Sequence, residues 1–207
     1  MKIKALFGGK SVIFLFSFFL ISCAATKLTS VYKDPSYAGG SIKSVLVVGV
    51  ADNIRNRKLF EDAFVNQFKS RGIEAVSNLT AIPKNMELTK EYIKETAERL
   101  KMDSVLVTHL VSVKEEEVLH SAVILPDPVG YHQFGTYFEV IYSDEYIPEH
   151  STQHQFVKLQ NNLYETKTEK LIWSATSEIM DPESVREIIE SLGKVIMKDL
   201  QKNNLIE

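Results

Sequence analysis

Two kinds of hydrophobic pattern divide the chain into halves. In the first half, short unbroken runs of apolar and β-branched residues alternate with stretches of helical spacing. The unbroken run at residues 44–50 is typical of a strand buried on both faces of a sheet. A short second strand is predicted at 73–76 and a third, again largely apolar, at 104–113. The intervening segments 54–71 and 89–101 have the spacing of amphipathic helices. This order indicates a small parallel sheet with right-handed crossovers.

The second half alternates apolar and polar residues instead. Residues 137–146, 156–164 and 171–179 carry apolar side chains at every second position, and a turn at 166–169 joins the last two segments. Such alternation predicts antiparallel strands with one face in solvent. We expect them to continue the first sheet as a meander.

The last predicted helix has the clearest apolar stripe in the chain. Asp181 is its expected N-cap and Pro182 its expected first residue. The stripe consists of aliphatic residues with helical spacing: Val185, Ile188, Ile189, Leu192, Val195, Ile196 and Leu200. This helix must pack on the sheet. The predicted fold class is therefore mixed α/β, with a β-α-β-α-β start of parallel strands, then an antiparallel meander and a C-terminal amphipathic helix on the sheet.

Length and charge narrow the classes of function. The chain has 207 residues, 44% hydrophobic and 25% charged, which fits one ordinary globular domain. The formal net charge is −3, and without residues 1–22, which carry three lysines and no acid, it becomes −6. Binding a phosphate backbone needs clustered lysine and arginine, so no nucleic-acid partner is expected.

The N-terminus has the parts of a secretion signal. Lys2, Lys4 and Lys10 give it a positive start, and residues 11–21 form an almost unbroken apolar stretch. This stretch is shorter than the roughly 20 residues that a membrane-spanning helix needs. Cys23, the only cysteine, ends a Leu-Ile-Ser-Cys run. That run resembles the lipobox of bacterial lipoproteins.

The lipobox resemblance implies cleavage before Cys23 and a lipid on its sulfur. A thioether-linked lipid would explain a lone cysteine in an exported protein, because no free thiol remains. Ala24, where some lipoproteins have aspartate, favours the outer membrane of a Gram-negative bacterium, with the chain on its periplasmic face; the inner membrane and the cell surface are alternatives. An ordinary signal peptide with a coincidental cysteine, and a retained transmembrane helix, are the other interpretations.

The expected organisation has three parts. They are a cleaved signal peptide at 1–22, the lipidated cysteine with a flexible tether at 23–43, and a single mixed α/β domain at 44–207. The tether is predicted from small and polar residues, and Tyr32 and Tyr37 are expected to dock part of it on the domain.

Several stretches of the chain resemble a family of uncharacterised proteobacterial lipoproteins. They are Val45–Val50 with Ala51-Asp52-Asn53, then Arg57-Lys58-Leu59-Phe60-Glu61, Gly72-Ile73-Glu74-Ala75-Val76-Ser77 and Leu171-Ile172-Trp173-Ser174-Ala175. The order of elements is also loosely similar to the small α/β domains of penicillin-binding-protein activator and curli-secretion lipoproteins. Those domains bind other envelope proteins, so the resemblance implies a protein-interaction role.

The loop after the first strand is the candidate ligand site. Asp52, Asn53, Arg55 and Arg57 lie where a strand end meets a helix N-terminus, the usual place for ligands in parallel α/β sheets. Free N–H groups and two arginines would attract an anion there. No glycine-rich loop accompanies them. In the structural alternative, Asp52 or Asn53 caps the helix and Arg57 pairs with Glu61.

Histidines give weaker signals. His109, in the third strand, joins the candidate ligand set, although a hydrogen-bonded sheet histidine is the alternative. His150 and His154 follow Glu149 and would suit a metal on a helix, but Pro148 and the flanking pattern predict a strand. No metal site is therefore expected.

Catalytic motifs are missing from the sequence. It contains no Gly-x-Ser-x-Gly run, no usable thiol and no zinc-protease pattern. Nothing places Asp127 and Glu139 together as a carboxylate pair for glycoside cleavage. No cofactor is expected, and enzymatic activity is not favoured.

The segment 120–135 is the candidate partner surface. It is long, aliphatic and aromatic, which suits a contact with a partner. Its candidate contact residues are Ile124, Leu125, Pro126, Tyr131 and Phe134. In the alternative, the segment folds back over the sheet edge.

Three hypotheses of function follow. The first is a non-enzymatic, lipid-anchored module that binds another envelope protein. The second is a small-anion-binding or hydrolytic domain that uses the loop after the first strand. The third is a purely structural tether without a specific partner.

Overall fold

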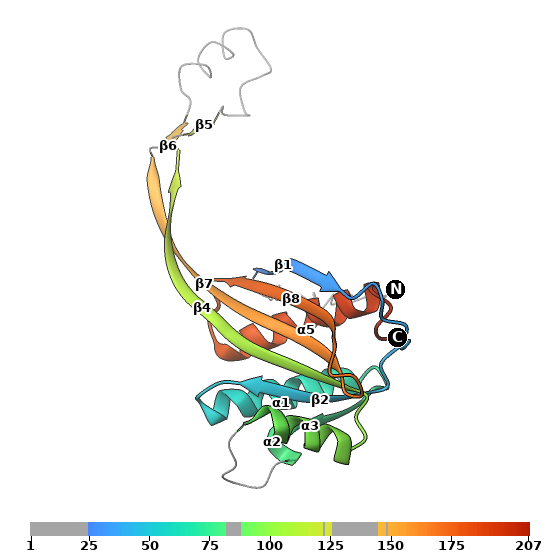
Figure 1. Ribbon diagram of the computed structural model, residues 1–207. Coiled ribbons are helices and arrows are strands. Elements are labelled where there is room, and N and C mark those ends of the chain that lie inside the picture. The colour runs from blue at the N-terminus through green and yellow to red at the C-terminus, as the bar shows by residue number, and fades with distance from the viewer. Residues whose placement is uncertain (1–24, 82–87, 122, 126–144, 148) are drawn as a thin grey trace, which may run out of the picture.

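The computed structural model describes residues 25–81, 88–121, 123–125, 145–147 and 149–207. They form a six-stranded mixed sheet covered by helices, with a separate pair of short strands (Figure 1). The mixed α/β prediction is confirmed. Among the helices of these residues, none is long and apolar enough to span a bilayer.

The sheet has the strand order β1-β8-β7-β4-β2-β3. Its strands are β1 (Ala25–Lys33), β2 (Ser44–Val50), β3 (Glu74–Ser77), β4 (Ser104–His120), β7 (His150–Glu165) and β8 (Leu171–Met180). The helices are α1 (Ile54–Lys69), α2 (Asn78–Ala81), α3 (Lys90–Arg99) and α5 (Val185–Lys202), and the short strands are β5 (Val123–Leu125) and β6 (Glu145–Ile147). β2 pairs in parallel with β3 and β4, and all other pairs are antiparallel.

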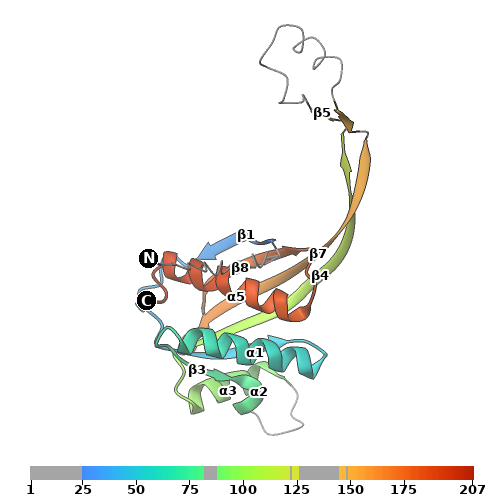
Figure 2. The same cartoon turned by 180° about the vertical axis from the view of Figure 1, so that it is seen from behind.

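One face of the sheet carries the main core. Helices α1 and α5 lie side by side on it (Figure 2). The apolar stripe of α1 consists of Phe60, Phe64 and Phe68, and it is buried there, as is Trp173 of β8. On the opposite face, α3 covers only the β2 and β4 region, where Ala97 packs in a smaller cluster.

Beyond α3, this second face is polar over β7 and β8. Gln160 donates from Nε2 to Ser174 Oγ at 2.7 Å, and Thr176 Oγ1 donates to Gln160 Oε1 at 2.8 Å. The side chains involved are half-buried. The prediction of half-solvated antiparallel strands holds for this region.

Residues 25–33 differ from the flexible tether expected over 23–43. They form β1, an edge strand paired with β8. Leu28 packs against the core and Thr26 Oγ1 donates to Ser191 Oγ of α5 at 2.7 Å, so the segment gains both apolar and polar contacts. Tyr37 also packs against the core, as expected, whereas Tyr32 is 48% exposed.

The last helix begins later than predicted. Its N-cap is Ser184, whose side chain accepts from Glu187 N, rather than Asp181. Asp181 has a left-handed backbone, with φ at 47°, directly after β8. Its carboxylate binds β7 groups instead, so it is not available as a cap.

The strand predicted at 137–146 lies mostly outside the described residues, and its last two residues belong to β6. The strands predicted at 104–113 and 156–164 are both longer than expected. β4 continues to His120 and β7 already starts at His150.

A buried carboxylate joins the first half of the fold. Glu61 of α1 is fully buried and accepts four donors: Gly49 N at 3.0 Å, Arg57 Nε at 3.0 Å, Ser77 Oγ at 2.7 Å and Leu79 N at 2.6 Å. These donors belong to α1, β2, β3 and α2. One side chain thus ties two helices to the end of the parallel strands.

We expect Glu61→Ala to lower the free energy of unfolding by about 3–5 kcal/mol, because the largely buried Arg57 and three other donors lose their acceptor. Urea unfolding measures this loss. The matched control is Asp62→Ala, which breaks an exposed pair with Lys58 and should cost less than about 1 kcal/mol. Equal losses for both variants would contradict the role given to Glu61.

Candidate functional site

The longest strands leave the body of the protein as a two-stranded ribbon. β2 pairs with β4 only as far as His109, and β8 pairs with β7 only from Phe156 onward. Beyond these points β4 and β7 pair with each other, up to His120 opposite His150. We call residues 115–120 and 150–155, together with β5 and β6, the arm.

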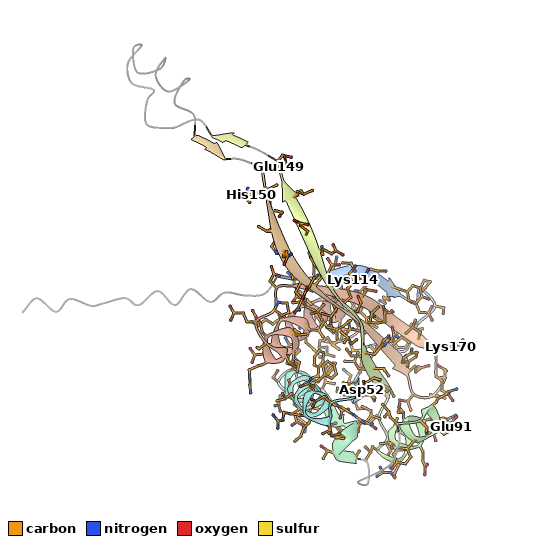
Figure 3. All side chains as sticks on the ribbon, turned by 90° about the vertical axis from the view of Figure 1, so that its left-hand side faces the viewer. Asp52, Glu91, Lys114, Glu149, His150 and Lys170 are labelled. Atoms are coloured by element: carbon orange, nitrogen blue, oxygen red, sulfur yellow. The ribbon has the colours of Figure 1, made fainter. Side chains whose placement is uncertain are left out.

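The arm projects from one end of the sheet (Figure 1). Lys114 lies where it leaves the body, and His150 and Glu149 lie toward its far end (Figure 3). The β4 side chains of the arm are exposed, and Leu119 reaches 70% exposure. This ribbon leads from the end of the sheet to the start of residues 120–135, the candidate partner surface.

A β-bulge sets which way the arm side chains face. The register shifts between Leu110 and Ser112, so Val113 lies opposite Val157 on the helix-covered face. Without the bulge, alternation would place Val113 on the same face as His109. After the bulge, alternation places Glu115 and Glu117 on the face of Val113, while Glu116 lies on the other face.

A row of polar side chains runs along that other face. His120 Nε2 and His154 Nε2 each lie 2.9 Å from Thr152 Oγ1, and His154 Nδ1 lies 2.5 Å from Asp181 Oδ2. The ring of His150 stacks on that of His120, with centroids 4.8 Å apart. The row links the arm to Asp181, which follows β8.

Asp181 fastens the base of the arm. Its Oδ1 accepts from Gln155 N at 2.7 Å, and its own N–H donates to Gln155 O at 2.8 Å. The hydrogen bond from His154, followed by that from Gln155, lowers the pKa of the Asp181 carboxyl. The carboxylate therefore stays charged and accepts the hydrogen bond of His154 Nδ1, which turns His154 Nε2 toward Thr152 Oγ1.

This row has the connectivity of a carboxylate, an imidazole and a hydroxyl, which in hydrolases activates a nucleophile. Here it lies on an exposed ribbon, and Asp181 also bonds the backbone of β7. The geometry accounts directly for a fixed arm base. It does not by itself supply a reaction.

An apolar groove lies beside the base of the arm, with a volume of about 290 Å³. Its walls come from β2, α1, β4, β7 and α5 and include Val50, Phe60, Leu110, Val113, Val157 and Ile188. Arg57 also lines it. Arg57 Nη2 is buried and has no hydrogen-bond partner among the described residues.

The structure brings together only part of the candidate ligand set. Arg57 and His109 both line the groove, while Asp52, Asn53 and Arg55 are exposed and do not. Asn53 caps α1 by accepting from Arg55 N and Asn56 N. Arg57 pairs with Glu61, so both features of the structural alternative occur.

The candidate partner residues fall at or beyond the end of the arm. Ile124 and Leu125 belong to β5, which pairs with β6. Pro126, Tyr131 and Phe134, and the lipidation candidate Cys23, lie outside the described residues.

Sequence reasoning missed the roles of Asp181 and Thr152. His150 and His154 lie on strand β7, so the helical spacing that would suit a metal does not occur. In the part of the chain that the structure describes, no group of three or more histidine, cysteine or acidic residues is arranged to hold a metal ion. The Thr-x-His alternation at 152–154 was the only available sign that these side chains share a face.

No protein-family model and no curated protein sequence matches this chain. Two similar solved structures are the PelC dodecamer from Paraburkholderia phytofirmans and the lipoprotein GNA1162 from Neisseria meningitidis. The PelC alignment has 14% identity, covers 86% of this chain and 98% of that chain, and has a TM-score of 0.47. The GNA1162 alignment has 11% identity, covers 77% of this chain and 98% of that chain, and has a TM-score of 0.43. Both likenesses are loose, so nothing about the function of this chain follows from them.

Asp181→Ala should loosen the arm base, because Gln155 N and His154 Nδ1 lose their acceptor. We expect faster hydrogen exchange of the Gln155 amide and unchanged exchange at Leu163 in the body, measured by NMR. Asp181→Asn retains acceptor oxygen and should have a smaller effect.

The lowered pKa of Asp181 also fixes a pH dependence. The stabilisation from the charged carboxylate is complete above its unfolded pKa, about 3.9, and is lost as the pH falls through the lower folded pKa. The exchange rates of wild type and Asp181→Asn should therefore converge in acid. A difference that persists there would contradict this assignment.

Proposed function

We propose that this chain is a non-enzymatic, lipid-anchored protein of the bacterial cell envelope that binds another envelope protein through its arm. The anchor is inferred from the Leu-Ile-Ser-Cys run that ends at Cys23. The binding role is inferred from the arm. Its location would be the periplasmic face of the outer membrane, as Ala24 after the cysteine favours.

The observation that carries the binding role is the extension of β4 and β7 beyond their neighbours. A two-stranded ribbon adds little to the core, and a free-standing one is at best marginally stable. This one carries β5 and β6 at its end, and the sequence between these strands is rich in aromatic and aliphatic residues. Such composition at the end of a projecting element suits a partner contact.

The strand order relates the proposed anchor to the arm. β1 begins at Ala25, which pairs with Met180, and Met180 pairs on its other side with Phe156 at the arm base. A lipid on Cys23 would be attached two positions before Ala25, or at most about 7 Å of chain away. The arm end of the sheet would thus be held at the membrane, so we expect a partner in or at the same membrane.

Small-anion binding is the alternative function. Its supporting observation is Arg57 Nη2, a buried donor without a partner at the wall of the groove. Thermal shifts of the wild type, Arg57→Ala and the control Arg55→Ala, measured with a panel of anions, test this function. Arg55→Ala is the control because Arg55 lies outside the groove. No stabilisation of the wild type by any anion would remove this alternative.

Cys23→Ser should abolish metabolic labelling with a lipid precursor and shift the protein from the detergent phase to the aqueous phase. The reason is that the thioether is the proposed membrane attachment. A variant that remains in the detergent phase as before would contradict the anchor.

A photo-crosslinking residue in place of Leu119, on the arm, should capture one dominant envelope protein in intact cells. The same residue in place of Lys167, in the exposed turn at the other end of β7, is the control and should not capture it. Deleting residues 122–133 should remove the captured protein while the fold is retained. Equal capture at both positions would count against the arm.

A further inference from the structure

The outer edge of β4 is unpaired along the arm. β2 accompanies β4 only to His109, and no other described strand pairs with β4 on that side up to His120. Backbone donors and acceptors on such an edge can pair with an added strand. The outer edge of β7 differs, because Asp181 occupies the N–H and the C=O of Gln155 at its base.

The apolar groove opens beside the beginning of this edge. Four of its apolar residues remain exposed: Val50 at 43%, Leu110 at 52%, Val113 at 52% and Val185 at 39%. The groove could therefore receive an apolar side chain from a strand that pairs with β4. The free Arg57 Nη2 in its wall could donate to a carbonyl oxygen of that strand.

Acidic side chains lie beyond the groove on the same face of the arm. Alternation places Glu115 and Glu117 on the face of Val113, one and two steps along the arm. Within the described residues, neither carboxylate takes part in an ion pair. A strand laid along this edge would meet an apolar position and then two acidic ones.

We propose that the β4 edge binds an extended peptide segment of a protein partner by strand addition, with an apolar side chain in the groove and basic side chains two and four residues along. The proposal rests on the proposed function, because it names the kind of segment that the arm recognises. Main-chain hydrogen bonds give the affinity, and the alternate apolar and basic side chains give the specificity. Acidic residues at an edge can also act only to prevent aggregation, and the experiment separates these roles.

The test uses the full-length chain in detergent and an end-blocked probe peptide, Thr-Val-Thr-Lys-Thr-Lys-Thr. Fluorescence anisotropy measures its binding, and NMR amide shifts locate it. We expect binding with shifts along residues 110–117. The same peptide with glutamate in place of lysine, and one with N-methylated backbone, should bind at least about tenfold more weakly.

Variants of the chain test the two halves of the surface. Glu115→Lys/Glu117→Lys should weaken binding about tenfold, whereas the matched control Glu91→Lys/Glu98→Lys on exposed positions of α3 should not. Val113→Asp should abolish binding by placing a charge at the groove. Val118→Asp changes a valine on the opposite face of the same strand and should leave binding unchanged.

Three outcomes would overturn the proposal. They are no preference for the lysine peptide, amide shifts away from β4, or a dimer of the chain joined through this edge. Without a preference for the lysine peptide, the glutamates would serve only to prevent aggregation at this edge. A dimer would mean that a second copy of the chain, and not a partner peptide, binds the β4 edge. If crosslinking at Leu119 still captures a partner, the proposed function stands even when the peptide does not bind.

Discussion

The buried amide of Asn161 fixes the register on which both the sheet and the arm depend. Its Oδ1 accepts from Thr108 Oγ1 at 3.0 Å, and its Nδ2 donates to Ala175 O at 3.1 Å and to Ser177 Oγ at 3.2 Å. The side chain is fully buried, so an unpaired amide there would be costly. A one-residue slip of β7 would turn Asn161 to the other face and break all three bonds. Because β4 and β7 run on into the arm, the same register determines which arm side chains meet.

Two sets of hydrogen bonds act at the end of the sheet that carries the arm. Glu61 holds the carboxyl ends of the parallel strands under α1, through Gly49 of β2 and Ser77 of β3. Beside them, the bulge after Leu110 turns Val113 toward the groove, and Asp181 binds β7 alone. The open edge of β4 and the exposed apolar wall of the groove therefore occur together, because the bulge in β4 and the hydrogen bonds of Asp181 to β7 act on neighbouring strands.

The sequence predicted the elements that depend on local periodicity. The apolar face of α1, the buried run of β2 and the α5 stripe from Ile189 to Leu200 lie in or against the core as expected, whereas Val185, at the start of that stripe, is 39% exposed. β1 was missed because a bulge between Leu28 and Ser30 breaks its alternation. The arm was missed because the run Lys-Glu-Glu-Glu at 114–117 is unfavourable for a strand by composition, and only pairing with β7 makes it one. Asp181 satisfied the rule for an N-cap, but its partners in β7 lie too far along the chain for the sequence to indicate them.

The stability of the arm should fall from its base to its end. Near the base, Asp181 adds hydrogen bonds to Gln155 and His154, whereas farther out the ribbon has only its own cross-strand pairs. Local opening is easiest where a segment has few buried contacts, so the far pairs should open first. A third strand on β4 would satisfy the free edge and supply the contacts that a two-stranded ribbon lacks. The base is already extended and fastened, so less ordering entropy would be lost there when such a strand binds. Binding would then spread order outward along the arm, toward the segment between β5 and β6 that the sequence marks as the partner surface.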